Sequence, residues 1–188
     1  ISTTDTTNGT VNVAGVETIT VTNSGTSSVD AVTAANATTL NLAGSGKLTV
    51  TDLNDTLTTI SAAGSTGTNI LDGFGATDAT ITGGAGADTF KMGETLTKAD
   101  TLDGGDGADT LVVNNTGGNA LTVMPASAVV SNIETLRIEA TDDSAADAFT
   151  FDASVVAFDN VVIDASDEND TYTFTKVSTE NISITESA

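Results

Sequence analysis

Two nine-residue segments carry residue types at a spacing that could bind a metal ion. They read GGAGADTFK at 83–91 and GGDGADTLV at 104–112, and they begin 21 residues apart. Glycines let the backbone curve tightly enough for its carbonyl oxygens to converge. The sixth position adds a carboxylate, Asp88 in one segment and Asp109 in the other. Oxygen atoms of both kinds suit a hard cation such as Ca²⁺, so the pair of segments predicts a cation site.

Weaker copies of the same pattern surround these two. The segment 64–72 keeps glycine at its first and fourth positions and places Asn69 at the sixth. The next segment begins at Gly73 and places Asp78 there. The segment 95–103 has lost its glycines, but it places Asp100 at the sixth position and ends on Asp103, a further candidate ligand.

The spacing also predicts which candidates lie together. If each segment is half a turn of a coil, alternate segments lie on the same side. One edge then carries Asn69, Asp88 and Asp109, and the other carries Asp78 and Asp100. We expect Ca²⁺ to bridge Asp88 and Asp109. The competing interpretation is that these turns only reverse the chain direction, for which glycine and aspartate are common choices.

Both complete segments match G-G-x-G-x-D-x-U-x, so the chain resembles the RTX (repeats-in-toxin) calcium-binding proteins. The acidic, cysteine-free remainder, rich in Thr, Ala and Asn, resembles RTX-type surface-layer proteins of Gram-negative bacteria. The resemblance implies that turn carbonyls also ligate Ca²⁺, which adds Gly83, Ala85, Gly104 and Asp106 as candidate ligands. It also implies type I secretion of an unfolded chain and an extracellular location at the bacterial cell surface. Separately, the sequence begins at Ile1 without a methionine and shows no targeting segment, so we expect a fragment of a longer polypeptide.

Composition narrows the classes of function. Twenty-six acidic side chains against five basic ones give a net charge of −21, which repels nucleic acids and anionic membranes. Neither Cys nor His is present, so thiolate and imidazole cannot bind a metal. No nucleophile motif, phosphate-binding loop or cluster of basic residues accompanies the carboxylates, so we expect no enzymatic activity and no membrane insertion.

Short alternating strands recur along the chain and predict the fold. Aromatic strands at 149–151 and 172–174 lie 23 residues apart, and aliphatic strands begin at 134, 160 and 181. Like strands that return at one interval indicate a coil in which each strand stacks on its predecessor. We therefore expect an all-β, parallel β-solenoid in one continuous stack, with β-solenoid coils at 1–63 and 113–188 and a calcium-binding β-roll at 64–112. The alternative is an antiparallel β-sandwich.

Two structural functions remain open. As a surface-layer protein, the chain would assemble with copies of itself into a calcium-dependent lattice. As part of an adhesin or toxin, it would be a calcium-dependent spacer. In either case, a cell-surface glycan or lipopolysaccharide would be bound through another part of the parent protein.

Overall fold

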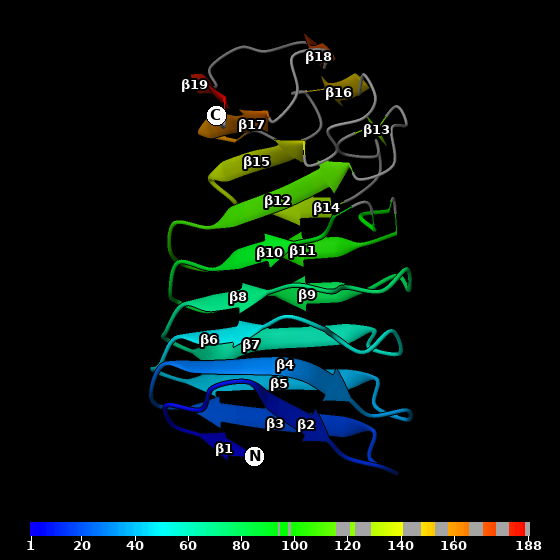
Figure 1. Cartoon of the computed structure of the whole chain (residues 1–188), viewed down its shortest axis with the longest axis vertical. Coiled ribbons are helices and arrows are strands. Elements are labelled where there is room, and N and C mark those ends of the chain that lie inside the picture. The colour runs from blue at the N-terminus through cyan, green and yellow to red at the C-terminus, as the bar shows by residue number, and fades with distance from the viewer. Residues whose placement is uncertain are drawn as a thin grey trace.

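The computed structural model is an all-β, parallel β-solenoid whose coils stack along one long axis (Figure 1). It describes residues 1–93, 95–97, 99–115, 121–122, 129–140, 148–152, 158–165, 171–175 and 181–186. No helix occurs among these residues. Every strand pair is parallel, so the predicted solenoid is confirmed and the antiparallel sandwich is wrong.

Two long sheets form the walls of the coil, and a separate, short third sheet lies near the C-terminal end. The seven-stranded sheet contains β1 (Ser2–Thr3), β3 (Thr18–Asn23), β5 (Thr39–Gly44), β7 (Thr59–Ser65), β9 (Thr80–Thr82), β11 (Thr101–Asp103) and β14 (Val129–Ser131). The nine-stranded sheet contains β2 (Gly9–Asn12), β4 (Ser27–Thr33), β6 (Leu48–Val50), β8 (Asn69–Leu71), β10 (Thr89–Lys91), β12 (Thr110–Asn115), β15 (Thr135–Ala140), β17 (Asn160–Ala165) and β19 (Asn181–Glu186). The third contains β13 (Leu121–Thr122), β16 (Ala148–Asp152) and β18 (Thr171–Thr175).

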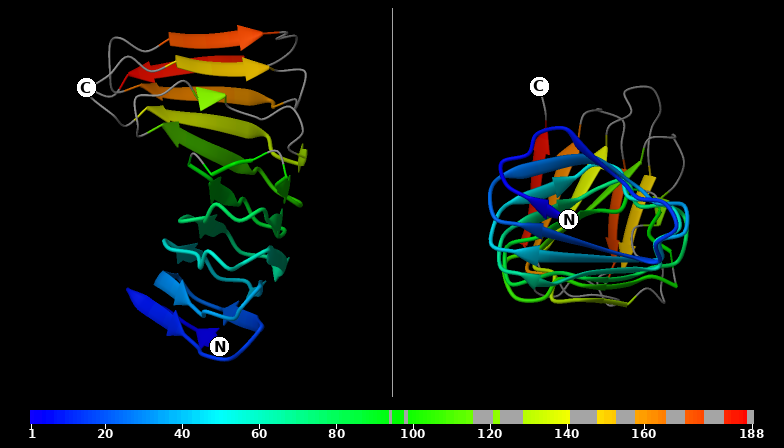
Figure 2. Two further views of the ribbon diagram at one scale, coloured as in Figure 1. Left: turned by 90° about the vertical axis from the view of Figure 1, so that its right-hand side faces the viewer. Right: turned by 90° about the horizontal axis from the view of Figure 1, so that it is seen from below.

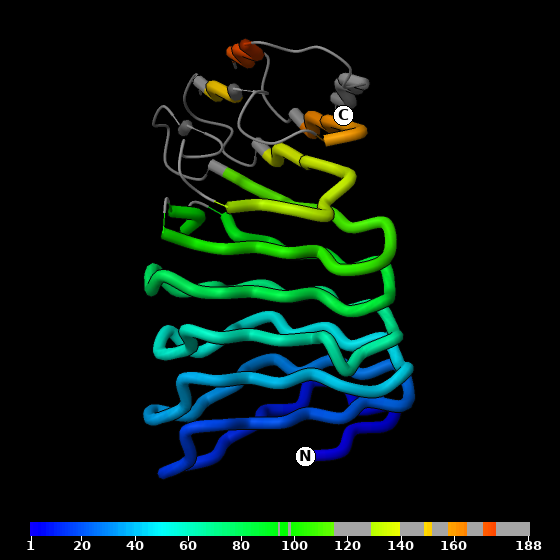
Figure 3. Tube along the Cα trace, turned by 180° about the vertical axis from the view of Figure 1, so that it is seen from behind, coloured from blue at the N-terminus to red at the C-terminus, as the bar shows by residue number. Residues whose placement is uncertain are grey.

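Successive coils follow one another without a break between the N-terminal strands and β12 (Figure 3). Strand β7 runs across the boundary expected at 63/64, and β12 runs across the one expected at 112/113. The glycine-rich segments are therefore coils within the same two sheets. Seen along the axis, the coils project onto one another, with the strands forming the walls and the turns the corners (Figure 2).

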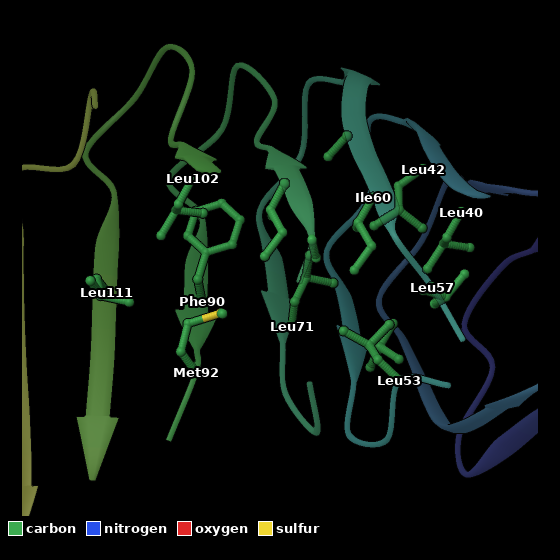
Figure 4. Packing of buried hydrophobic residues seen from close by; sticks show 14 of the residues in the cluster. Leu40, Leu42, Leu53, Leu57, Ile60, Leu71, Phe90, Met92, Leu102 and Leu111 are labelled. Carbon is green, nitrogen blue, oxygen red and sulfur yellow. The ribbon is translucent and has the colours of Figure 1, made fainter. Parts of the chain in front are cut away.

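Alternation along each strand builds the core. A β-strand points successive side chains to opposite faces, so Thr, Ser or Asn between aliphatic residues leaves the aliphatic side chains inside. In-register pairing then stacks those side chains in columns, as Leu71, Phe90 and Leu111 do in β8, β10 and β12 (Figure 4). All three are fully buried, as the nonapeptide pattern predicts for Phe90 and Leu111.

The predicted recurrence of aromatic strands is also confirmed. Strand β16 pairs with β18 so that Phe149 lies opposite Tyr172 and Phe151 opposite Phe174. The rings of Phe149 and Tyr172 stack at 5.0 Å between centroids, and those of Phe151 and Phe174 meet edge to face at 6.1 Å. The 23-residue interval is thus one turn of the coil.

Candidate metal centre

The two glycine-rich turns stack directly on one another at one corner of the solenoid. Strands β10 and β12 pair with Phe90 opposite Leu111, which places Asp88 next to Asp109 in the preceding turns. The same register relates β8 to β10 and brings Asn69 beside Asp88. Half-turn spacing predicts this column of three residues, and the structure contains it. These turns lie on the left side of the molecule in Figure 1.

Each carboxylate in this column accepts a hydrogen bond from a backbone N–H of the preceding coil. The Asn69 backbone N–H donates to Asp88 Oδ1 at 2.7 Å, and the Asp88 N–H donates to Asp109 Oδ1 at 2.6 Å. The Asp109 N–H in turn donates to Glu134 Oε2 at 2.7 Å. Asp88 and Asp109 are each only 1% exposed. The column therefore buries negative charge at successive steps of the stack, and burial of a charge is costly unless it is compensated.

In the N-terminal coils, the hydrogen bonds between successive turns at this corner have different acceptors. There the equivalent N–H groups, of Ser27 and Leu48, donate to the backbone carbonyl oxygens of Lys47 and Thr68 in the following coil. No carboxylate accepts these two hydrogen bonds. The side chains of Ser27 and Leu48, a hydroxyl and an aliphatic group, stand where the later coils have Asn69 and Asp88. The change from carbonyl to carboxylate acceptors occurs at Asn69, whose N–H donates to Asp88 in the first complete nonapeptide.

A column of glycines allows the turns to approach so closely. Gly25, Gly46, Gly67, Gly86 and Gly107 lie one above another, and the carbonyl oxygen of each of the first four lies against the next glycine. A Cβ atom at Gly67 would lie 2.1 Å from the Gly46 oxygen, and one at Gly86 would lie 2.4 Å from the Gly67 oxygen. Any side chain here would force the coils apart.

The carboxylates of Asp88 and Asp109 differ in their hydrogen bonds. Asp88 Oδ1 accepts from both the backbone and the side-chain amide of Asn69, and Asp88 Oδ2 accepts from the Gly84 N–H at 2.7 Å. In the next turn the corresponding N–H, of Gly105, donates to Asp103 Oδ1 instead. Asp109 Oδ2 is consequently buried without a hydrogen-bond partner.

The burial of Asp109 and the acidic residues around it shift the pKa of its carboxyl group. Burial raises the pKa of its carboxyl group from 3.8 to about 6. The hydrogen bond from the Asp88 N–H opposes that shift, while the negative charges of Asp88, Glu134 and Asp103 add to it. Within the described residues, Lys and Arg side chains form ion pairs only with Asp72, Glu139 and Asp164, so none of them pairs with this group.

The residues at this corner suit a hard cation. The carbonyl oxygens of Gly83, Ala85, Gly104 and Asp106, the candidate ligands from resemblance, accept no hydrogen bond from any described residue. Within the same part of the chain, no three acidic side chains converge closely enough to hold a metal by themselves. Since Ca²⁺ takes about six to eight oxygen ligands, carbonyl oxygens and water would have to complete its shell.

The opposite corner corrects one sequence-based prediction. Asp100 is buried, and its carboxylate accepts hydrogen bonds from the N–H groups of Ala79 and Thr97 at 2.8 and 2.6 Å. The register of β9 and β11 aligns Asp100 with Ala79, so Asp78 is one residue out of the expected position. Asp78 is exposed, and its carboxylate accepts from the Thr97 hydroxyl. The turn before β9 holds one residue more than a nonapeptide, which explains the shift.

Two residues at the corner of Asp88 and Asp109 were not predicted from the sequence, namely Asn132 and Glu134. Their turn is short and lacks glycine at the expected positions, so it does not match the nonapeptide. A signal was nevertheless present, because Glu134 directly precedes an aliphatic strand, as Asp88 and Asp109 precede theirs. Aligning strands instead of turns would have found it.

No protein-family model, no curated protein and no solved structure matches this chain. Among the described residues, no helix is long and apolar enough to cross a membrane.

Proposed function

We propose that this chain is a calcium-binding segment of an extracellular structural protein of the RTX type. The ion joins the turn 83–88 to the turn 104–109, so that calcium stabilises the stack. Ligands are drawn from Asp88, Asp109 and the carbonyl oxygens of Gly83, Ala85, Gly104 and Asp106. The observation that carries the proposal is the in-register stacking of two buried aspartates in two turns that also contain four carbonyl oxygens accepting no hydrogen bond from the described residues.

The charge of the chain supports a role for the metal in folding. A net charge of −21 opposes a compact state by self-repulsion, and the carboxylate column concentrates that repulsion at one corner. A bound divalent cation offsets it and adds its binding energy to the folded state. Calcium-poor cytoplasm would leave this segment open for type I secretion, and calcium outside the cell would fold it.

Self-assembly into a surface layer is the biological role that we propose for the parent protein. The segment offers long, regular, polar faces with many exposed Thr side chains, and acidic faces that ions could bridge between copies. The alternative is a spacer of an adhesin or toxin. Electron microscopy of the full-length protein with calcium separates the two, because ordered two-dimensional sheets support the lattice and dispersed rods support the spacer.

Calcium binding is tested by calorimetry and thermal unfolding of the chain and of Asp88→Asn. Calcium at about 100 times its Kd adds about 2.7 kcal/mol to stability, so the midpoint of the wild-type chain should rise clearly. Asp88→Asn should bind fewer ions and show a smaller rise. Asp30→Asn is the matched control, since Asp30 is exposed on β4 and its carboxylate makes no hydrogen bond within the described residues. A wild-type midpoint unaffected by calcium would refute the proposal.

A further inference from the structure

The outer face of the seven-stranded sheet is almost free of charge. Strands β3, β5, β7, β9 and β11 follow one another up the stack, and their in-register pairing aligns their outward side chains in columns (Figure 1). One column consists of threonines alone, Thr18, Thr39, Thr59, Thr80 and Thr101. The column two residues further along each strand consists of Thr20, Asn41, Ser61, Thr82 and Asp103. We call these two columns the threonine face. Asp103, at its C-terminal end, is its only charged member.

The outer face of the nine-stranded sheet has a different character. It carries charged side chains on β4, β10, β15 and β17, namely Asp30, Lys91, Arg137, Glu139 and Asp164. With a net charge of −21, two copies of the chain repel one another wherever their acidic surfaces meet. The threonine face is therefore the described surface through which two copies can approach with the least repulsion.

The hydroxyl groups of the threonine column are free to bond outside the chain. None of them makes a hydrogen bond within the described residues. In the turns, by contrast, the hydroxyls of Thr56 and Thr77 donate to the carbonyl oxygens of Ala37 and Asp55 in the preceding coil at 2.6 and 2.7 Å. A hydroxyl group both donates and accepts, so a surface of hydroxyls complements an identical surface, whereas a surface of carboxylates does not. Threonine is also stiff at χ1, so burying it in a contact costs little side-chain entropy.

We propose that the threonine face binds the threonine face of a second copy of this chain. Both surfaces repeat at the strand spacing of about 4.8 Å, so the coils of one copy match those of the other. A two-fold axis closes such a contact, because each patch meets itself. Five short strands at this spacing give a patch of several hundred Å², at the low end for specific interfaces, so the pairing is reversible. This contact would be one interface of the proposed surface layer, and the choice of partner rests on that proposed function.

Sedimentation equilibrium of the whole chain in CaCl₂, over a range of protein concentrations, tests the contact. Thr59 is exposed at the middle of its column, so a symmetric contact places it next to Thr59 of the second copy. Thr59→Lys lowers the negative charge of the chain and Thr59→Asp raises it, but each variant sets like charges opposite one another. We expect both to raise the dissociation constant of the dimer about tenfold or more.

The same two substitutions at Thr49 are the matched controls. Thr49 faces outward on β6 of the other sheet, so Thr49→Lys and Thr49→Asp change the net charge equally and should dimerise nearly as the wild type does. Circular dichroism in calcium establishes that each variant remains folded.

Two results would overturn the contact. If the wild type sediments as a monomer at every concentration, a second copy is not the partner of this face. If Thr59→Lys dimerises as tightly as the wild type or more tightly, copies associate through another surface. The proposed function is judged separately. Ordered sheets of the full-length protein carrying Thr59→Lys would refute the contact and leave the surface layer standing. A wild type that dimerises through Thr59 but binds no calcium would refute the calcium site and leave the contact standing.

Discussion

The backbone N–H of Asp88 donates a 2.6 Å hydrogen bond to Oδ1 of Asp109 in the next coil. A side chain therefore performs at this corner what a backbone carbonyl performs at Leu48, whose N–H donates to Thr68. The two halves of the corner column should respond differently to calcium, because only the carboxylate half places like charges next to one another.

Hydrogen exchange in a calcium chelator should reveal this difference. We expect the amide protons of Asn69, Asp88 and Asp109 to exchange about tenfold or more faster than those of Ser27 and Leu48, since local opening relieves repulsion among the carboxylates. Added calcium should slow exchange in the first group and leave the second nearly unchanged. Equal protection of both groups in the chelator would contradict the expectation.

Replacement of Gly67 by alanine should separate the coils. Its Cβ would lie 2.1 Å from the Gly46 carbonyl oxygen, which belongs to the backbone and cannot rotate away. We expect Gly67→Ala to lose about 3 kcal/mol or more of unfolding free energy in urea. Gly64→Ala is the control, because its nearest neighbour is the Ala43 Cβ at 3.2 Å, and it should cost about 1 kcal/mol or less. Similar losses in both variants would show that the glycine column does not limit coil spacing.

The sequence predicts the fold and one corner well because both depend on local periodicity. Alternation fixes which side chains face inward, and the recurrence of like strands fixes the stacking of Phe90 on Leu71. The sequence predicts side-chain positions less well where a turn is longer or shorter than in the nonapeptide. One extra residue before β9 moves Asp78 out of position, and a short turn brings Glu134 into the acidic column without any glycine signature. Gly25 and Gly46 are 21 residues apart, as Gly86 and Gly107 are, but Ser27 and Leu48 stand where the complete nonapeptides have aspartate, so the pattern does not identify them.

The core column should tolerate leucine at position 90 better than alanine. Phe90 is completely buried between Leu71 and Leu111, so Phe90→Ala leaves a cavity and should cost about 3–5 kcal/mol. Phe90→Leu reproduces the side chain of both neighbours and should cost about 1.5 kcal/mol or less. Urea unfolding in saturating calcium measures both. Thr89→Ala, on the outer face of the same strand, is the control. An alanine variant as stable as the leucine variant would show that packing in this column contributes little to the unfolding free energy.

Stability in the absence of calcium should fall as the pH rises toward neutrality, and Asp109 should be a principal cause. Burial raises the pKa of Asp109 from 3.8 to about 6, so the folded chain holds a proton that the unfolded chain releases between these values. The folded state therefore loses stability as the pH rises through this window, and the loss is complete above about 6.

Urea unfolding at a series of pH values in a chelator measures this effect as the difference between the wild type and Asp109→Asn. The variant cannot ionise at this position, so the difference should change between about pH 4 and 6 and remain constant above that range. Calcium binds the ionised carboxylate, so its affinity for the wild type should rise through the same window and reverse the trend. A wild-type curve parallel to that of the variant would show that Asp109 ionises equally easily in the folded and unfolded chains, and the case for an uncompensated charge at this corner would fail.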